Sequence, residues 1–576
     1  MTRPPVPQTT ADSTSIWSTL RHPAFRGIWL ASALYFIANA MHVMAAAWIM
    51  VDRAGSSFLA ALVQTAVFLP MFALSLPAGV LADTTDRRRL ILLSLAVQGA
   101  AVLLLALLLV LGWAGPATIL LLTFVAGCCI AVMSPAWNSA IAEILPREQL
   151  PQAIVAVGIA YNAARALGPT AAGLIYAGVS AWVLADAGPA AAPAAELAVG
   201  AAQGVAAGVA EGVIAARAAG WAGGTVLLLA LAGVLVLAWA MNHWPARPHP
   251  PSRLPPERLW GGTLAGLRYA WHSEIILAQL LRTAAYGGAG SALWALLPSI
   301  GAQRLGSGAE GYGLMMGCLG SGAVVVGLGI GPLRQRLGLE GLVATACVVF
   351  AAAMAIAALS RWSLPVYLAL AAAGGAWMSV MSTFNTATQT SAPPWVRSRA
   401  TALHVLSALG SFALGSAFWG AVAGVAGLQA ALLIAAALLL AGLLLARPFP
   451  LRMGQADEVR QMPFKALLVA DEPDPEAGPV AVELIYRVRP GEVAGFLAEA
   501  ELLRAPRQRD GATFWRLYRD LDERTRYVER FIVHSWAEYL RQRERATEAD
   551  RALQARVNAF LADGERVQVR HYLAER

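Results

Sequence analysis

An arginine lies in the middle of one of the long apolar runs of this chain. Arg165 stands between Asn162 and Gly168-Pro169, inside the run 152–177. A cation at the centre of an apolar helix in a bilayer costs at least about 2.5–3.5 kcal/mol on insertion scales, so it should face other helices and have a partner there. Two roles remain open: contact with an anionic or polar ligand, or a structural arginine held by carbonyl groups at a helix end.

A second arginine, Arg282, lies about half-way along the later run 274–298. Its side chain could face the same interior as Arg165, or its long stem could reach back to the membrane surface. Two cations facing one cavity would suit an anionic ligand such as a catecholate or a carboxylate.

Other polar side chains are scattered through the apolar runs, and each could hydrogen-bond a ligand or join two helices. His42 is distinguished because an imidazole can change charge near neutral pH and could carry a proton. The alternative, which we favour, is a neutral histidine that packs helices together. The polar candidates in the runs are Asn39, His42, Gln64, Asn138, Asn162, Asn385 and Gln389.

A charged turn separates the second apolar run from the third. We expect its residues to act in gating rather than in binding, because charges at a membrane face can hold helix ends together and release them. The alternative is a plain basic loop that only fixes orientation. The gating candidates are Gly79, Asp83, Asp86, Arg87 and Arg88, together with Gly168 and Pro169 beside Arg165.

The composition is that of a membrane protein followed by a soluble tail. Hydrophobic residues make up 58% of the chain, charged residues only 14%, and the mean hydropathy is +0.57. The last 97 residues, 480–576, hold 18 Arg and 16 Asp or Glu, which is 34 of the 78 charged residues. The net charge of +8 comes mainly from short loops beside apolar runs, so we do not expect nucleic acid binding.

Apolar runs of about 20 residues, long enough to span a bilayer, occur in two sets of six. This number is typical of transporters built from two parallel halves. The fold class expected is an all-α membrane protein with a small α+β domain. The runs are 27–51, 58–82, 90–112, 117–141, 152–177, 222–242, 274–298, 310–331, 341–359, 364–391, 400–424 and 427–446.

Loop charges predict the orientation. Thirteen arginines fall in the loops of one side and four in those of the other, so the first side should be cytoplasmic, with both termini there and the chain in the cytoplasmic membrane. The expected organisation is a tail 1–26, a six-helix bundle 27–242, a Pro-rich cytoplasmic linker 243–273, a second bundle 274–446, a linker 447–479 and a cytoplasmic domain 480–576.

The Ala- and Gly-rich segment 178–220 interrupts this plan on the external side. Its spacing permits an amphipathic surface helix in Leu197–Ala219. A disordered low-complexity insertion is the alternative.

The tail changes periodicity from helical to mixed. Alternating and helical segments follow one another in the order β-α-β-β-α-β, which is the ferredoxin-like order. The segments are 480–488, 492–504, 513–520, 526–534, 536–562 and 566–573.

The tail lacks an evident catalytic arrangement. Its aromatic and histidine residues form no nucleophile-base pair, metal spacing or phosphate-binding loop. We therefore expect a non-enzymatic tail, acting in homodimer formation or regulation, with no metal and no cofactor. Cys128, Cys129, Cys318 and Cys347 lie in apolar runs and should be packing residues. The tail residues considered are Trp515, Tyr518, Tyr527, His534, Trp536 and His571.

Several motifs resemble one family. The turn Gly79–Arg89 resembles the signature loop of major facilitator superfamily transporters, although Asp86 stands where Gly is usual and Thr84 where Arg is common. The segments Pro135–Leu150, Asn162–Pro169 and Ala292–Pro298 are similar to the branch that includes enterobactin exporters, whose members often carry the label transmembrane secretion effector. The stretch Phe514–Tyr572 resembles the soluble tail of some members and the antibiotic-biosynthesis monooxygenases.

This resemblance implies a twelve-helix transporter that exports a small organic molecule, such as a siderophore, drug or secondary metabolite, by proton antiport. Gly168-Pro169 resembles the motif in the fifth helix of antiporters, with Ala164 and Ala172 where Gly is usual. Two alternatives remain: an uptake permease, and a transporter fused to a catalytic monooxygenase-like domain.

Overall fold

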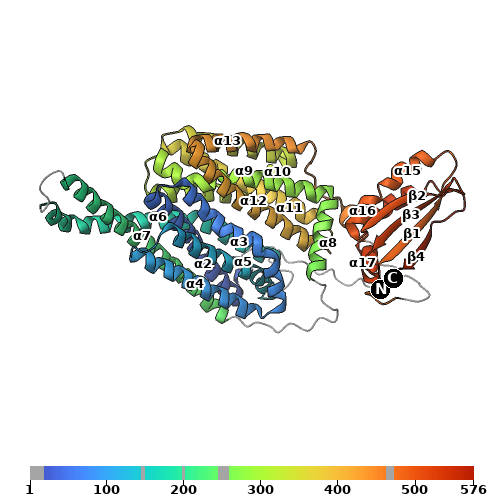
Figure 1. Cartoon of the computed structure of the whole chain (residues 1–576), viewed down its shortest axis with the longest axis horizontal. Helices are drawn as coiled ribbons and strands as arrows, with labels where there is room; N and C mark the ends of the chain where they lie inside the picture. The colour runs from blue at the N-terminus through green and yellow to red at the C-terminus, as the bar shows by residue number, and fades with distance from the viewer. Residues whose placement is uncertain (1–18, 145–149, 197–201, 244–258, 462–472, 576) are drawn as a thin grey trace, which may run out of the picture. The chain divides into compact units, whose positions relative to one another are not determined.

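The computed structural model describes residues 19–144, 150–196, 202–243, 259–461 and 473–575 (Figure 1). By its contacts the chain forms two compact units. Unit 1 comprises Met1–Pro251, Ala284–Ser382 and Leu406–Leu444, and unit 2 comprises Ser252–Thr283, Thr383–Val405 and Leu445–Arg576.

Long apolar helices make up most of the chain, as the runs predict. Ten helices in the described ranges are long and apolar enough to cross a membrane. The long helices are α2 (Pro23–Ala54), α3 (Ser57–Thr84), α4 (Arg87–Val110), α5 (Pro116–Ile144), α6 (Leu150–Glu196), α7 (Ala202–Asn242), α9 (Glu274–Ser299), α10 (Ala309–Leu359), α11 (Ser363–Ser391), α12 (Arg397–Ala426) and α13 (Leu428–Ala441). Short segments follow some of them: η3 (Ile300–Arg304), η4 (Gly442–Ala446) and α14 (Ala456–Val459).

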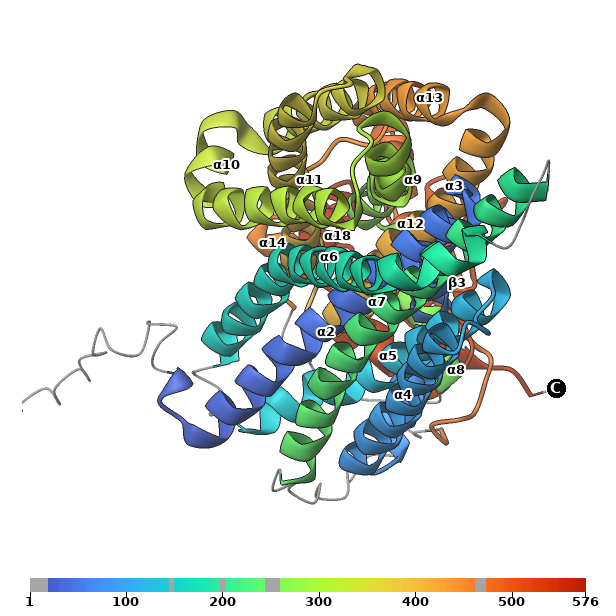
Figure 2. The ribbon, with the colours of Figure 1, turned by 90° about the vertical axis from the view of Figure 1, so that its left-hand side faces the viewer.

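Helix α10 contains two of the predicted spans. Gly338 interrupts it with φ 67° and ψ 178°, a left-handed conformation that glycine adopts without steric cost. With α10 counted as two spans, and with α9, which is not among the ten, the described helices supply the twelve predicted spans. Within unit 1, α6 packs against both α2 and α10 (Figure 2).

One prediction about the connections, a separate surface helix in 178–220, is wrong. Residues 202–219 belong to α7 and α6 continues to Glu196, so in the described residues the span helices extend into 178–220 and no separate surface helix forms (Figure 1). Alanine is the strongest helix former, which explains these extensions. The predicted linker 243–273 also contains a helix, α8 (Leu259–His272).

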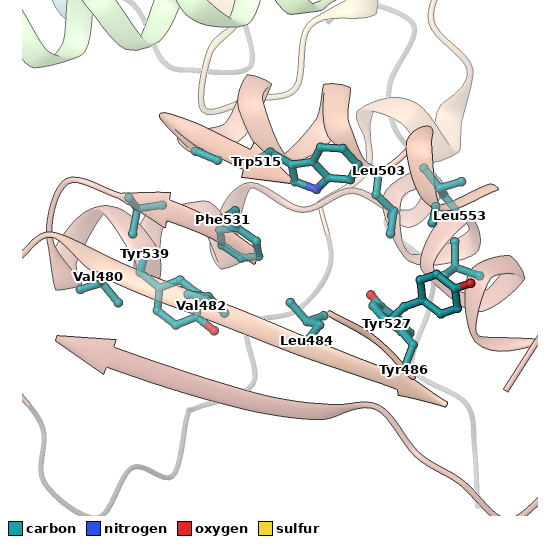
Figure 3. Packing of buried hydrophobic residues seen from close by; sticks show 14 of the residues in the cluster. Val480, Val482, Leu484, Tyr486, Leu503, Trp515, Tyr527, Phe531, Tyr539 and Leu553 are labelled. Carbon is teal, nitrogen blue, oxygen red and sulfur yellow. The ribbon is translucent and has the colours of Figure 1, made fainter. Parts of the chain in front are cut away.

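The C-terminal domain has the predicted order of strands. β1 (Val480–Arg487), β2 (Phe514–Arg519), β3 (Arg526–Val533) and β4 (Gln568–Leu573) form one sheet in the order β2-β3-β1-β4, and every neighbouring pair is antiparallel. The core lies between this sheet and the helices, where Tyr486, Trp515, Tyr527 and Phe531 of the strands meet Leu553 of α18 (Figure 3).

The helices of this domain are more broken than predicted. They are α15 (Val493–Glu501), α16 (Arg504–Asp510), α17 (Trp536–Arg545) and α18 (Glu548–Asn558). The prediction of a single helix over 536–562 is wrong because a new helix begins after its N-cap residue, Thr547. Its hydroxyl accepts from the Asp550 amide while the Asp550 carboxylate accepts from the Thr547 amide, a capping box that marks a helix N-terminus.

Candidate functional site

Arg165 of α6 lies against the aromatic rings of two helices. Its guanidinium carbon is 4.5 Å from the ring centre of Trp294 in α9 and 6.0 Å from that of Tyr161 in α6. A guanidinium over an indole face is attracted by the ring quadrupole, and the interaction strengthens where water is excluded. The partner expected for this cation is therefore an aromatic ring from the second six-helix half.

Trp294 is part of a larger aromatic cluster. Its ring centre is 6.0 Å from that of Trp377, which in turn lies 5.3 Å from Tyr286, 5.8 Å from Phe350 and 5.8 Å from Phe412. The hydroxyl of Tyr286 and the indole N–H of Trp294 are buried and have no hydrogen-bond partner among the described residues. We call these five residues the aromatic cluster.

Buried donors without partners are rare in folded proteins and often mark a functional position. Next to a cation and several ring faces, the two donors of the aromatic cluster could serve a planar, anionic or hydrogen-bonding ligand. Sequence reasoning missed Tyr286. A readable signal was the spacing of Tyr286, Gly290 and Trp294 every four residues, which places them on one helix face.

Gly168 and Pro169 lie where α6 meets two other helices. A Cβ added at Gly168 would stand 2.7 Å from the Ala40 Cβ and 2.9 Å from the Ile37 carbonyl oxygen in α2. On the other side, a Cβ added at Gly313 of α10 would stand 2.6 Å from the Pro169 carbonyl oxygen. Only glycine permits these approaches, so the predicted gating motif is a point of close packing for α6.

Asn39 belongs to a hydrogen-bonded trio. The Gln98 amide donates to the Asn39 oxygen at 2.9 Å, and the Tyr35 hydroxyl donates to the Gln98 oxygen at 2.9 Å. Asn39 also donates to the Tyr35 carbonyl. The trio joins α2 to α4, and sequence reasoning missed Gln98 and Tyr35.

His42 and Gln64 are both buried. The His42 Nε2 lies 3.2 Å from the Thr123 hydroxyl of α5. This geometry fits a helix-joining imidazole and leaves the proton-carrying role a prediction.

Three of the remaining polar candidates, Asn162, Asn385 and Gln389, make contacts within their own helices. The Asn162 amide donates to the Gly158 carbonyl, and the Gln389 amide donates to the Asn385 oxygen at 3.1 Å. Asn138 lies in α5, but its side chain is outside the described part of the structure.

Arg282 belongs to unit 2, whereas Arg165 belongs to unit 1. Only 4% of Arg282 is exposed. Its guanidinium carbon lies 5.8 Å from the ring centre of Phe384, and a terminal nitrogen donates to the Phe449 carbonyl at 3.5 Å. Within unit 2 this arginine therefore contacts the segment that follows α13.

The charged turn has a defined local structure. The Asp86 carboxylate accepts from the Arg89 amide at 3.0 Å and caps the N-terminus of α4. Arg88 donates to the backbone carbonyl and the side-chain oxygen of Asn242, at the end of α7. Arg87 begins α4, Gly79 lies in α3, and the side chain of Asp83 is outside the described residues.

A buried carboxylate stands at the centre of the C-terminal domain. Glu529 accepts from the Tyr486 hydroxyl at 2.7 Å, from the Trp515 indole at 2.9 Å and from Arg507 at 3.0 Å. Burial acts to raise its pKa, but the Arg507 guanidinium and these hydrogen bonds outweigh burial and hold the pKa of Glu529 below its usual range. Sequence reasoning missed Glu529, although strand alternation places it between inward-facing Tyr527 and Phe531.

Most of the tail residues considered for catalysis pack the domain. Trp515, Tyr527 and Trp536 belong to its buried core, while Tyr518 and His534 are exposed. His571 Nε2 lies 2.7 Å from the Tyr539 hydroxyl, and burial, helped by Arg543, lowers the pKa of His571. In the described ranges no three His, Cys, Asp or Glu side chains gather as metal ligands, and none of the four cysteines forms a disulfide.

Comparison with known proteins matches almost the whole chain to one family. The model of the transmembrane secretion effector family matches residues 14–199 and 189–576. The multidrug efflux pump Tap of Mycobacterium bovis and of Mycobacterium tuberculosis is 27% identical over 425 residues, which cover 72% of this chain and 90% of the relative.

Solved structures agree on the fold. A bacterial homologue of the human lysosomal transporter Spinster superposes with a TM-score of 0.55 at 16% identity, over 74% of this chain and 98% of that one. A D-xylose-proton symporter gives 0.54 at 11% identity, over 74% and 97%. The helices of this chain therefore have the major facilitator fold, and the chain belongs to the transmembrane secretion effector family of major facilitator superfamily transporters.

Proposed function

We propose that this chain is a secondary active efflux transporter of the cytoplasmic membrane, with both termini in the cytoplasm, and that it exports a small organic molecule by proton antiport. The excess of arginine in alternate loops supports this orientation. The relative named as a multidrug efflux pump supports export. The sequence has one lysine, Lys465, and no phosphate-binding Gly-x-x-x-x-Gly-Lys-Ser/Thr loop, which favours an ion gradient over ATP as the energy source.

The observation that carries the proposal is the contact of Arg165 with Trp294. It joins α6 of the first half to α9 of the second, with 4.5 Å between the guanidinium carbon and the ring centre. The two buried donors without partners among the described residues, the Tyr286 hydroxyl and the Trp294 indole N–H, belong to the same cluster. A planar anion such as a catecholate would pair with the guanidinium and stack on a ring of the aromatic cluster. Rocking of the two halves would then remake this contact in every cycle.

The test is energised efflux from cells that express the chain. Cells are preloaded in turn with enterobactin, erythromycin and ethidium, and an uncoupler is added to half of the samples. We expect efflux of the catecholate that stops with the uncoupler and falls at least about tenfold in Arg165→Ala. Arg361→Ala is the matched control, because Arg361 is an exposed loop arginine.

The cellular content of each compound tests the direction of transport. Higher cellular content in expressing cells than in empty cells would contradict export and favour an uptake permease. Efflux of ethidium alone would contradict the anionic substrate class. Efflux that persists with the uncoupler would contradict gradient coupling.

A further inference from the structure

We propose that the C-terminal domain is a brace that holds the ends of α8, α9, α11 and α12 together as one body, and that transport depends on it. All of these ends lie in unit 2 with the domain. The boundary between the units passes through α9 after Thr283, through α11 after Ser382 and through α12 after Val405. The functional half of this inference rests on the transport function proposed above.

The first part of the brace is a chain of charges between α8 and α17. Arg268 of α8 donates to the Glu538 carboxylate at 3.0 Å, and Arg545 donates to the same oxygen at 2.8 Å. Arg545 also donates to the Asp510 carbonyl at 2.9 Å. Only 15% of the Glu538 side chain and 6% of the Arg545 side chain are exposed, so these charges are largely shielded from solvent.

The second part is aromatic. The Arg545 guanidinium carbon lies 4.5 Å from the ring centre of Trp395, in the turn between α11 and α12. The Trp395 ring packs edge-on against Tyr269 of α8, with ring centres 5.4 Å apart. The Arg509 guanidinium carbon lies 5.7 Å from the ring centre of Tyr269, and Arg509 is itself paired with Asp550.

The third part is the segment that enters the domain from α13. The Gly454 amide donates to the Ser391 hydroxyl at the end of α11 at 2.8 Å. The Gln279 amide of α9 donates to the Arg452 carbonyl, and Arg282 of α9 donates to the Phe449 carbonyl, each at 3.5 Å. The segment and the domain thus contact α8, α9, the end of α11 and the turn that leads into α12.

These contacts differ from ordinary surface ion pairs. An exposed pair contributes little to stability, and removing one partner of a shielded pair leaves the other charge uncompensated. Glu538 accepts from Arg268 of α8 and from Arg545 of α17. Neutralising Glu538 would therefore weaken its contacts with both arginines. Since alternating access moves each half largely as a rigid body, loose helix ends should slow the movement.

Hydrogen exchange of the purified full-length chain tests the joint without any transport substrate. In Arg268→Glu, repulsion from Glu538 should raise the exchange of the α8 amides at least about tenfold. Exchange in β1 and β3 should stay unchanged, which shows that the domain is folded. Arg556→Glu is the matched control because Arg556 pairs with Glu499 at the same 3.0 Å but is 57% exposed. An α8 exchange that stays within about twofold of the wild type would overturn the brace.

Efflux measurements test the second part of the inference, that transport depends on the brace. They use the compound that the wild-type chain exports in the efflux panel. Arg268→Glu should lower the maximal rate at least about fivefold and leave the half-saturating concentration unchanged, since no substrate contact is touched. Glu538→Gln should act in the same direction, and Arg556→Glu should have no effect. A rate that stays the same or rises would overturn the dependence of transport on the brace. Because exchange needs no substrate, failure of the brace and failure of the export proposal are distinguishable.

Discussion

The guanidinium carbon of Arg165 lies 4.5 Å from the ring centre of Trp294, so a cation of the first six-helix half rests on an aromatic ring of the second half. Neither residue is near the other in sequence, and both lie in unit 1. The contact satisfies the requirement that a cation inside a helical bundle has a partner. It also leaves the charge of Arg165 available to an anion, because an aromatic ring attracts the cation without neutralising it.

Removing the Trp294 ring should weaken substrate binding more than it weakens the fold. A desolvated cation–π contact contributes about 1–2 kcal/mol. We therefore expect Trp294→Leu to raise the half-saturating concentration for efflux about fivefold to thirtyfold. Efflux measured over a range of loading concentrations checks this. Trp362→Leu is the control, since Trp362 is 77% exposed, and an equal effect in both variants would contradict the role of Trp294.

The packing of Gly168 against α2 predicts a sharp dependence on side-chain size. Gly168→Ala would place its Cβ 2.7 Å from the Ala40 Cβ, and overpacking of this kind costs about 1–3 kcal/mol. The apparent melting temperature of the purified chain should fall by several degrees. Gly178→Ala in the same helix is the control, because a Cβ there would meet nothing within 4 Å. Equal melting temperatures for the two variants would contradict the close approach.

The membrane spans could be predicted because a helix that lies in a bilayer must consist mostly of apolar residues. Runs of about 20 apolar residues match the thickness of the hydrocarbon core, and even the two spans of α10 are separated in the sequence by Gly338. The partners inside the bundle could not be predicted. Whether Asn39 meets Gln98, or Arg165 meets Trp294, depends on the rotation of each helix about its axis, and packing between distant segments sets that rotation.

The prediction for the segment 178–220 was wrong for a different reason. The Ala- and Gly-rich composition of 178–220 suggested a surface helix or a disordered insertion, yet α6 and α7 extend into this segment. The break between α17 and α18 was readable, since Thr547 and Asp550 have the spacing of a capping box. Glu529 was readable from strand alternation, but its partner Arg507 comes from a helix whose position the sequence does not reveal.

Loss of the Glu529 charge should destabilise the C-terminal domain. Its carboxylate holds Tyr486, Trp515 and Arg507, and its side chain is 1% exposed. Removing one partner of a buried pair typically costs about 3–5 kcal/mol. In Glu529→Gln we expect exchange of the β3 amides to rise at least about a hundredfold. Glu483→Gln on the same sheet serves as the control, and equal protection in both variants would contradict a central role for Glu529.

The same carboxylate predicts a pH dependence of domain stability. The pKa of Glu529 is lower in the folded domain than its ordinary value of 4.5. Its ionisation therefore contributes stability that is fully present above about pH 4.5 and is lost as the pH falls through the folded pKa. The difference in unfolding free energy between the wild type and Glu529→Gln should shrink below this pH. Exchange of the β3 amides, corrected for the intrinsic pH effect, measures it, and a constant difference down to about pH 3 would contradict the lowered pKa.

Substitutions of Asp86 distinguish a helix-capping role from a gating role in the charged turn. Its carboxylate accepts from the Arg89 amide at 3.0 Å at the start of α4, and an asparagine can accept the same bond without a charge. If capping is its role, Asp86→Asn should keep efflux within about twofold of the wild type, while Asp86→Ala should cost about 1 kcal/mol of helix stability. Efflux rates and exchange of the first α4 amides check the two expectations. A loss of efflux in Asp86→Asn with normal α4 protection would show instead that the negative charge itself acts in gating.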